Sequence, residues 1–317
     1  MEAKVEKALQ DVVKKIKKAH PDKSIVIEKL TLDVFGFSRG AAGARNFIHK
    51  ALFGEGDCLS ILSRLVDELG YTVGQVEVCF VGLYDTVSSF GYLLPLNSNN
   101  TRALHLDAVA NAKAVVHLAA ADVHRKYFAL TDIGSAAGKG RQYFLPGIHS
   151  DIGGGYRDNG TETQTIYRGF EFNAQAERAR LIDAGWYTEK EITLNSSGDE
   201  LLSVATLTVK RPNIGNGYSQ IPLHLMAGYA RESKINIISE LESDEPVPAK
   251  LRQVHTKLQE YINAQGPYSS KAEDWHCNDL GWLRQLRHDY FHFSARLKMG
   301  HTPCFKRGQR SRQTHEG

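Results

Sequence analysis

A serine between two glycines is the residue of this sequence whose setting points most directly to chemistry. The segment LTLDVFGFSRGAAGARNFI (30–48) passes from apolar, β-branched residues through Gly36, Ser38 and Gly40 into an Ala- and Arg-rich stretch of helical character. In a Gly-x-Ser-x-Gly nucleophile elbow, the serine stands on a sharp strand-to-helix turn, and the N–H of the next residue, here Arg39, contributes to an oxyanion hole. The alternative is a tight turn in which Ser38 only caps the helix.

Two later residues, Asp85 and His149, complete the set that a serine nucleophile requires. A serine hydroxyl is a weak nucleophile until a histidine accepts its proton and a carboxylate orients that histidine. Asp85 directly follows the apolar run VEVCFVGLY, and His149 stands just after RQYFLPG in the glycine-rich loop IHSDIGGGY. The chain order Ser, Asp, His is that of α/β hydrolases. The sequence therefore predicts a triad of Ser38, His149 and Asp85.

Each of these residues also has a simpler interpretation. Asp85 suits an Asx turn or a helix N-cap, and His149 suits a hydrogen-bonded loop histidine. Asp151 competes with Asp85 for the role of the acid. The glycines at 153–155 lack the spacing of a phosphate-binding loop, so we expect them to turn the backbone and to hold His149 beside Ser38.

The order of the secondary-structure elements must bring these residues together. The segments expected to be helical are 1–20, 39–52, 57–69, 105–128, 221–235 and 251–266, and the extended ones are 24–37, 76–87, 141–147 and 288–295. Alternation of this kind predicts an α/β fold with a mostly parallel sheet. The expected triad residues all follow strands, at the sheet edge where α/β enzymes place functional groups.

The chain divides into three expected parts. Residues 1–159 form the core with the elbow, 160–220 an insertion or cap, and 221–317 the C-terminal part of the same domain with a basic tail. The aromatic residues of the insertion either cap an acyl pocket or form a local core; they are Phe170, Phe172, Trp186 and Tyr187. The tail from Arg296, rich in Lys and Arg, is expected to be mobile or to bind a partner.

Composition excludes several classes of function. The 317 residues carry a net charge of +3, which gives no electrostatic footprint for nucleic acid. The four cysteines form no Cys-x-x-Cys pair, so neither a zinc knuckle nor a redox motif is visible. Residues 1–20 form an amphipathic pattern and not a signal peptide. The sequence also lacks an apolar run of the roughly 18 residues that a membrane span needs.

Several blocks together resemble a known family. The blocks DVFGFSRGAAGAR, VGLYDTVSSFG, LPGIHSDIGGGY and IPLHLMAGYA, with AAADVHRKYFAL and LRHDYFHFSA, are similar to the α/β-hydrolase domains that include phospholipase effectors of the bacterial type VI secretion system. The resemblance spans about residues 30–317 and leaves 160–220 uncovered. Four motifs in one order are far more specific than a lone Gly-x-Ser-x-Gly.

The resemblance implies a serine lipase that hydrolyses acyl esters of membrane phospholipids. The family's serine, aspartate and histidine fall on Ser38, Asp85 and His149. Such effectors are made in the bacterial cytoplasm, injected into the periplasm of a rival cell through the secretion apparatus, and neutralised at home by an immunity protein. The resemblance implies no obligatory cofactor. Calcium is implied for some such lipases, and Asp151 and Asp158 offer oxygen ligands here.

One departure from the family opens two alternatives. Members usually begin with a strand bearing Asp-Gly-Thr, whereas Met1 here opens on the helix before the elbow strand, so the first strands of the sheet and the second oxyanion N–H are expected to be missing. The chain is then a catalytically inactive or truncated hydrolase-like domain that binds a partner. The other alternative is a different acyl hydrolase, such as a cutinase-like esterase or a thioesterase.

Overall fold

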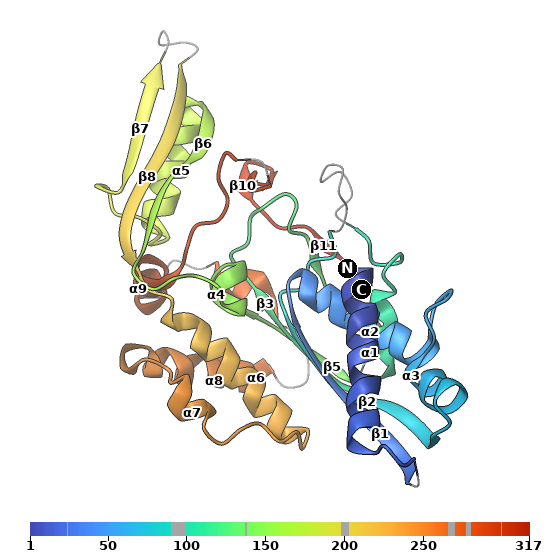
Figure 1. Cartoon of the computed structure of the whole chain (residues 1–317). Coiled ribbons are helices and arrows are strands. Elements are labelled where there is room, and N and C mark those ends of the chain that lie inside the picture. Colours follow the sequence, from blue (N-terminus) through green and yellow to red (C-terminus); the bar gives the residue numbers. More distant parts are fainter. Residues whose placement is uncertain are drawn as a thin grey trace.

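A parallel four-stranded sheet forms the centre of the molecule. The computed structural model describes residues 1–23, 25–89, 99–136, 138–197, 203–265, 270–276, 280–298 and 300–317. The central strands are β1 (Val26–Phe37), β2 (Thr72–Tyr84), β3 (Ala112–Ala120) and β5 (Gly140–Leu145), in the order β1-β2-β3-β5. Every neighbouring pair is parallel, so the carboxyl ends of all four strands meet at one edge. Helices flank this sheet (Figure 1), and the predicted α/β fold class is confirmed.

Two hydrophobic cores cover the two faces of this sheet. One packs α1 (Glu2–Ala19), α2 (Arg39–Phe53), α3 (Ile61–Ser63) and a π-helical turn, η1 (Arg64–Glu68), against residues such as Val81 and Leu83 of β2. The other packs α4 (His149–Gly153), α6 (Gln220–Glu232), α8 (Arg252–Gln265) and α9 (Gly281–Tyr290) against residues such as Phe80 and Leu118. Alternate residues of a strand point to opposite faces, so each central strand contributes to both cores.

A second, antiparallel sheet projects from this body (Figure 1). It contains β6 (Gly160–Phe170), β7 (Ile192–Ser197) and β8 (Val204–Ile214) in the order β6-β8-β7, with α5 (Glu171–Asp183) packed on it. Trp186 and Tyr187 are buried in the main core, whereas Phe170 and Phe172 are 59% and 79% exposed. Trp186 and Tyr187 are therefore core residues, as the local-core interpretation expects, whereas Phe170 and Phe172 are not.

Short elements complete the chain. They are η2 (Leu106–Asn111), β4 (Leu130–Thr131), η3 (Gly134–Ala136), η4 (Gly217–Ser219), α7 (Leu241–Asp244), η5 (Ala249–Leu251), η6 (Ala272–Trp275), β9 (Phe305–Lys306), β10 (Gln309–Arg310) and β11 (Thr314–His315). Both ends of the chain lie near α2 (Figure 1). Met1 packs against the cluster that contains Ala42, and the Gly317 N–H donates to Asp132, whose carbonyl accepts from Arg45.

Two expected elements are wrong. The helix expected over 105–128 is instead η2 followed by β3, an interior strand paired on both sides and buried from Val115 to Ala120. An apolar strand covered on both faces shows no alternation, so its pattern does not distinguish it from a buried helix. The strand expected at 288–295 is also absent: α9 continues to Tyr290, and the N–H of Phe293 donates to the Glu162 carboxylate rather than to a neighbouring strand.

The expectation of a mobile C-terminal tail is wrong as well. The segment folds back over the body, where β9 and β10 form a hairpin and β11 pairs with β4. Arg310 is buried and donates to the Glu177 carboxylate (2.5 Å), an acid of α5. A buried guanidinium held by a buried carboxylate anchors this segment in place.

Candidate active site

Ser38 stands on a strained turn between β1 and α2. Its φ of 59° and ψ of −126° are a combination that L-residues rarely adopt. Gly36 permits the turn, because a Cβ at that position would lie 2.6 Å from Ala41 Cα and 2.6 Å from the Gly40 carbonyl oxygen. Gly40 has no such role, since a Cβ there would meet nothing within 4 Å. The Ser38 side chain makes no capping hydrogen bond to α2, so the capping interpretation does not hold.

The structure brings Ser38, His149 and Asp85 together in one hydrogen-bonded chain. The Ser38 hydroxyl donates to His149 Nε2 (2.7 Å), and His149 Nδ1–H donates to Asp85 Oδ2 (2.5 Å). They come from the end of β1, the first turn of α4 after β5, and the end of β2. The rings of Phe37 and Phe128 hold the imidazole, with centroids 4.6 and 5.0 Å away. This is the geometry of a nucleophile, a base and an orienting acid.

The Asp85 carboxylate is fully buried, and a guanidinium that the sequence did not point to neutralises it. Arg312 Nη1 donates to Oδ1 (2.6 Å) and Nη2 to Oδ2 (2.9 Å), while the Ala120 N–H also donates to Oδ1 (2.9 Å). Burial alone would raise the pKa of Asp85, but the charge of Arg312 and the hydrogen bond from His149 outweigh it and hold that pKa well below its usual range. Asp85 is therefore a carboxylate at neutral pH.

The imidazole of His149 is poised to accept a proton. Burial lowers the pKa of His149 most, and the charges of Arg125 and Arg312 lower it further, against the opposing influence of Asp85. The ring is thus neutral at neutral pH, which a general base requires.

A second buried histidine, His117, supports the turn that carries Asp85. The Thr86 N–H donates to His117 Nε2 (3.0 Å), and Nδ1 pairs with the Gln142 side-chain oxygen (2.8 Å). Burial lowers the pKa of His117 to about 4, so the ring stays neutral and its Nε2 accepts the hydrogen bond from the Thr86 N–H. Asp85 itself has a φ of 42°, and this hydrogen bond to the next residue holds its turn in place. His117 lies within the run expected to be helical, so its role was not predicted.

The remaining predicted residues occupy supporting positions. Arg39 is the first residue of α2, where a backbone N–H has no partner within the helix, and its side chain donates to the Ser89 carbonyl (3.1 Å). Asp151 does not contact His149 as an acid would: its carboxylate accepts from the Ile148 N–H (2.9 Å) and faces His292 (3.2 Å). It therefore fixes the first turn of α4.

The residues suggested for calcium do not gather. Asp158 accepts from the N–H of Asn216 (3.2 Å), and within the described ranges the one group of His, Cys, Asp and Glu side chains close enough to share an ion is His49, Glu55 and His105. That group contains neither Asp151 nor Asp158. Calcium therefore remains a prediction without an assigned ligand set.

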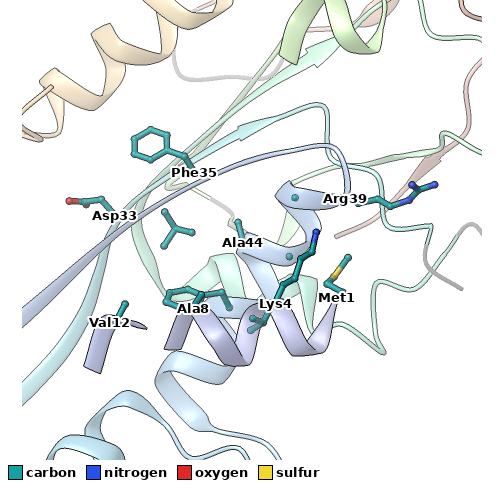
Figure 2. A pocket seen from close by; sticks show the side chains of 13 residues that line it. Met1, Lys4, Ala8, Val12, Asp33, Phe35, Arg39 and Ala44 are labelled. Carbon is teal, nitrogen blue, oxygen red and sulfur yellow. The ribbon is translucent and has the colours of Figure 1, made fainter. Parts of the chain in front are cut away.

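An apolar hollow lies beside the elbow, between α1, β1 and α2 (Figure 2). It encloses about 570 Å³. Its wall begins at Arg39 and Gly40, the two residues after Ser38, and continues along Phe35, Ala44 and Ala8. A mainly apolar wall next to a nucleophile suits an acyl chain. None of the described helices is both long enough and apolar enough to span a bilayer.

Comparison with known proteins finds a family model that matches part of this chain and a solved structure with a similar fold. Residues 67–179, which include Asp85 and His149, match the family model of the catalytic domain of Tle1-like phospholipase effectors of the type VI secretion system. A solved structure of the Tle1 effector bound to the VgrG spike of that system superposes with a TM-score of 0.68 at 21% identity, over 99% of this chain and 73% of that one.

Two further comparisons add little. An uncharacterised protein from Pseudomonas aeruginosa matches at 18% identity over 87% of this chain and 33% of that one, but a TM-score of 0.38 is too low to inform the fold. None of the curated proteins matches the sequence. The matched segment and the shared fold confirm the resemblance: this chain is similar to the catalytic domains of Tle1-like type VI secretion phospholipase effectors.

Proposed function

We propose that this protein is a serine lipase that hydrolyses acyl esters of membrane phospholipids as a type VI secretion effector. The observation that carries the proposal is the hydrogen-bonded chain from Ser38 through His149 to Asp85 on a strained elbow. The match to a phospholipase effector family supports the substrate class.

The first half-reaction transfers the acyl group to the enzyme. Ser38 Oγ attacks the ester carbonyl while His149 Nε2 takes the hydroxyl proton, and Asp85 stabilises the imidazolium that forms. The Arg39 N–H and the positive end of α2 stabilise the oxyanion. The imidazolium then gives its proton to the departing alcohol oxygen of the lysophospholipid, which leaves an acyl ester on Ser38.

The second half-reaction regenerates the enzyme. His149 takes a proton from a water molecule that attacks the acyl carbonyl, and the resulting tetrahedral intermediate expels Ser38 Oγ, which receives that proton. The products are a fatty acid and free enzyme. The apolar hollow beside Arg39 holds the acyl chain through both steps.

Arg312 acts on this reaction through Asp85. Its two hydrogen bonds fix the carboxylate in the plane that His149 needs, and its charge offsets the cost of burying an anion. We therefore assign Arg312 as a positioning residue.

The comparison supports a proposal for the delivery route. The Tle1 effector of the solved structure is bound to a VgrG spike, and we propose that this chain likewise travels with a component of the secretion apparatus. An antibacterial role in the periplasm of the target cell, with a cognate immunity protein in the producing cell, is part of the same proposal.

A non-catalytic function is the second candidate, because β1 lies at an edge of its sheet. Within the described residues β1 pairs only with β2, and its Val26 and Phe35 are 64% and 44% exposed. An exposed strand edge with apolar side chains is a ready site for a partner chain.

Hydrolysis by wild type and Ser38→Ala, measured side by side, distinguishes the two candidates. The substrates are a short-chain nitrophenyl ester and a fluorescent phospholipid in mixed micelles. The lipase proposal expects wild-type turnover of both and loss of about 10³-fold or more in the variant. A folded wild-type protein without activity supports the binding function instead, and equal activity in the variant rules out Ser38 as the nucleophile.

A further inference from the structure

A cavity lined by basic side chains lies behind the triad, on the far side of Arg312. It measures about 570 Å³ and lies between the end of β3, η6 and the returning C-terminal segment. Arg312 belongs to its wall, whereas Ser38, His149 and Asp85 do not. The cavity is therefore separate from the site at which an ester would react.

The charge of the wall is strongly positive. Five cationic side chains line the cavity against one carboxylate, that of Glu273; the cations are Lys271, Lys306, Arg307, Arg310 and Arg312. Glu177 neutralises Arg310 and Asp85 neutralises Arg312. The charges of Lys271, Lys306 and Arg307 enter no ion pair within the described part of the chain. Three free cations and one carboxylate leave an excess of two positive charges, which attracts anions.

Two buried nitrogen atoms of the wall lack a partner. Arg310 and His124 are 7% and 9% exposed, and Arg310 Nη1 and His124 Nδ1 form no hydrogen bond to any described residue. Both atoms are closed off from the cavity itself, so they offer no direct contact to a ligand. Burial and the charge of Arg310 both lower the pKa of His124, which agrees with a positive field in the cavity.

Donors from separate elements suit an anion with several oxygen atoms. Lys271 comes from the segment that opens η6, whereas Lys306 and Arg307 come from the β9–β10 hairpin. A guanidinium matches the geometry of a phosphate, and an ammonium group adds a compact charge.

We propose that this basic cavity binds a phosphate group, either inorganic phosphate or the headgroup of an anionic phospholipid. The inference does not depend on the proposed hydrolysis, because the wall contains no triad residue. If the ligand is a headgroup, the cavity is a second point of contact with phospholipid. If the ligand is inorganic phosphate, the cavity is a site for a free anion.

Binding to the Ser38→Ala protein tests the proposal, because this variant leaves vesicles intact and Ser38 is outside the cavity. One arm is calorimetric titration with inorganic phosphate up to about 10 mM in a phosphate-free buffer at 0.15 M ionic strength. The other arm is sedimentation with vesicles of phosphatidylglycerol and phosphatidylcholine, compared with phosphatidylcholine alone. The test variant adds Lys306→Gln and Arg307→Gln, and the matched control adds Lys17→Gln and Lys18→Gln on the exposed face of α1.

The proposal expects saturable binding that weakens at least about tenfold in the Lys306/Arg307 variant, because two of the three cations that lack an ion pair are lost. The Lys17/Lys18 control keeps its affinity. Response to phosphate alone identifies the free anion, and response to phosphatidylglycerol vesicles alone identifies the headgroup. Absence of binding in both arms overturns the proposal, as does an equal loss in the control, which would show attraction to surface charge in general.

Discussion

Replacement of Arg312 by glutamine removes the cation that neutralises the buried triad acid. The guanidinium makes two of the hydrogen bonds to Asp85, at 2.6 and 2.9 Å, and its side chain is only 8% exposed. In the variant, burial dominates and raises the pKa of Asp85. The loss of a nearby positive charge also raises the pKa of His149, because Arg312 is one of the groups that lower it.

The magnitudes follow from the burial of this pair. Breaking a buried ion pair by removal of one partner costs about 3–5 kcal/mol of folding stability. Asp85 has a depressed pKa in the folded state, so its contribution is present above its unfolded pKa of about 4 and is lost as the pH falls. The stability difference between wild type and variant is therefore largest at neutral pH and shrinks in acid. We expect kcat/KM at its optimum to fall about 10- to 100-fold, from the loss of one or two charged hydrogen bonds.

The assay is ester hydrolysis from pH 5 to 9 together with urea denaturation at pH 7 and pH 4. In Arg312→Gln the acid limb of kcat/KM moves to higher pH, because His149 must be neutral to act as the base. Arg312→Lys keeps the positive charge and returns the acid limb toward its wild-type position. The control Lys298→Gln, an exposed change in the same C-terminal segment, alters neither the pH profile nor the stability. If Arg312→Gln only lowers the maximum of kcat/KM and leaves the acid limb of the pH profile at its wild-type position, the positioning role of Arg312 is refuted.

Three further predictions concern the elbow, the acid and the hollow. Gly36→Ala lowers the free energy of unfolding by about 1–3 kcal/mol and abolishes activity, because the added Cβ would clash with the backbone of Gly40 and Ala41. Gly40→Ala is tolerated, since a Cβ there meets nothing within 4 Å. Thermal melts and ester assays check both variants, and equal tolerance of the two would contradict the steric argument. Asp85→Asn lowers kcat about 10³- to 10⁴-fold by stabilising the wrong tautomer of His149, and a loss below tenfold argues against its role. Ala8→Trp fills the hollow in Figure 2 and lowers activity on esters with long acyl chains about tenfold, whereas activity on short esters is unchanged. The loss corresponds to two methylene groups of the acyl chain that can no longer be buried, at about 0.8 kcal/mol each. Ala3→Trp, outside the hollow, is its control.

The candidate triad was predictable because its signals are local. Each residue follows an apolar segment, and parallel strands bring their carboxyl ends to one edge, so Ser38, Asp85 and His149 meet once the sheet forms. The order of elements likewise sufficed for the α/β class. The nature of β3 was missed because an interior strand of Ala, Val and Leu shows no alternation, and its length with flanking residues resembles that of a helix.

Arg312 was missed because its role depends on a contact across 227 positions of sequence. A basic tail usually signals a solvated segment, and nothing in its local pattern shows that Arg310 and Arg312 are buried against carboxylates of other elements. The need for such a cation is visible only after Asp85 is found to be wholly buried, since an unpaired buried charge is too costly to persist.

Labelling with a fluorophosphonate probe, read by mass spectrometry of the digested protein, tests the central claim most directly. Such a probe reacts with a serine only when a base activates it. The account predicts one adduct, on the peptide that carries Ser38, and its disappearance in Asp85→Asn and at pH values that protonate His149. A folded protein that takes no label, or that takes it on another residue, would contradict the assignment of Ser38 as the nucleophile.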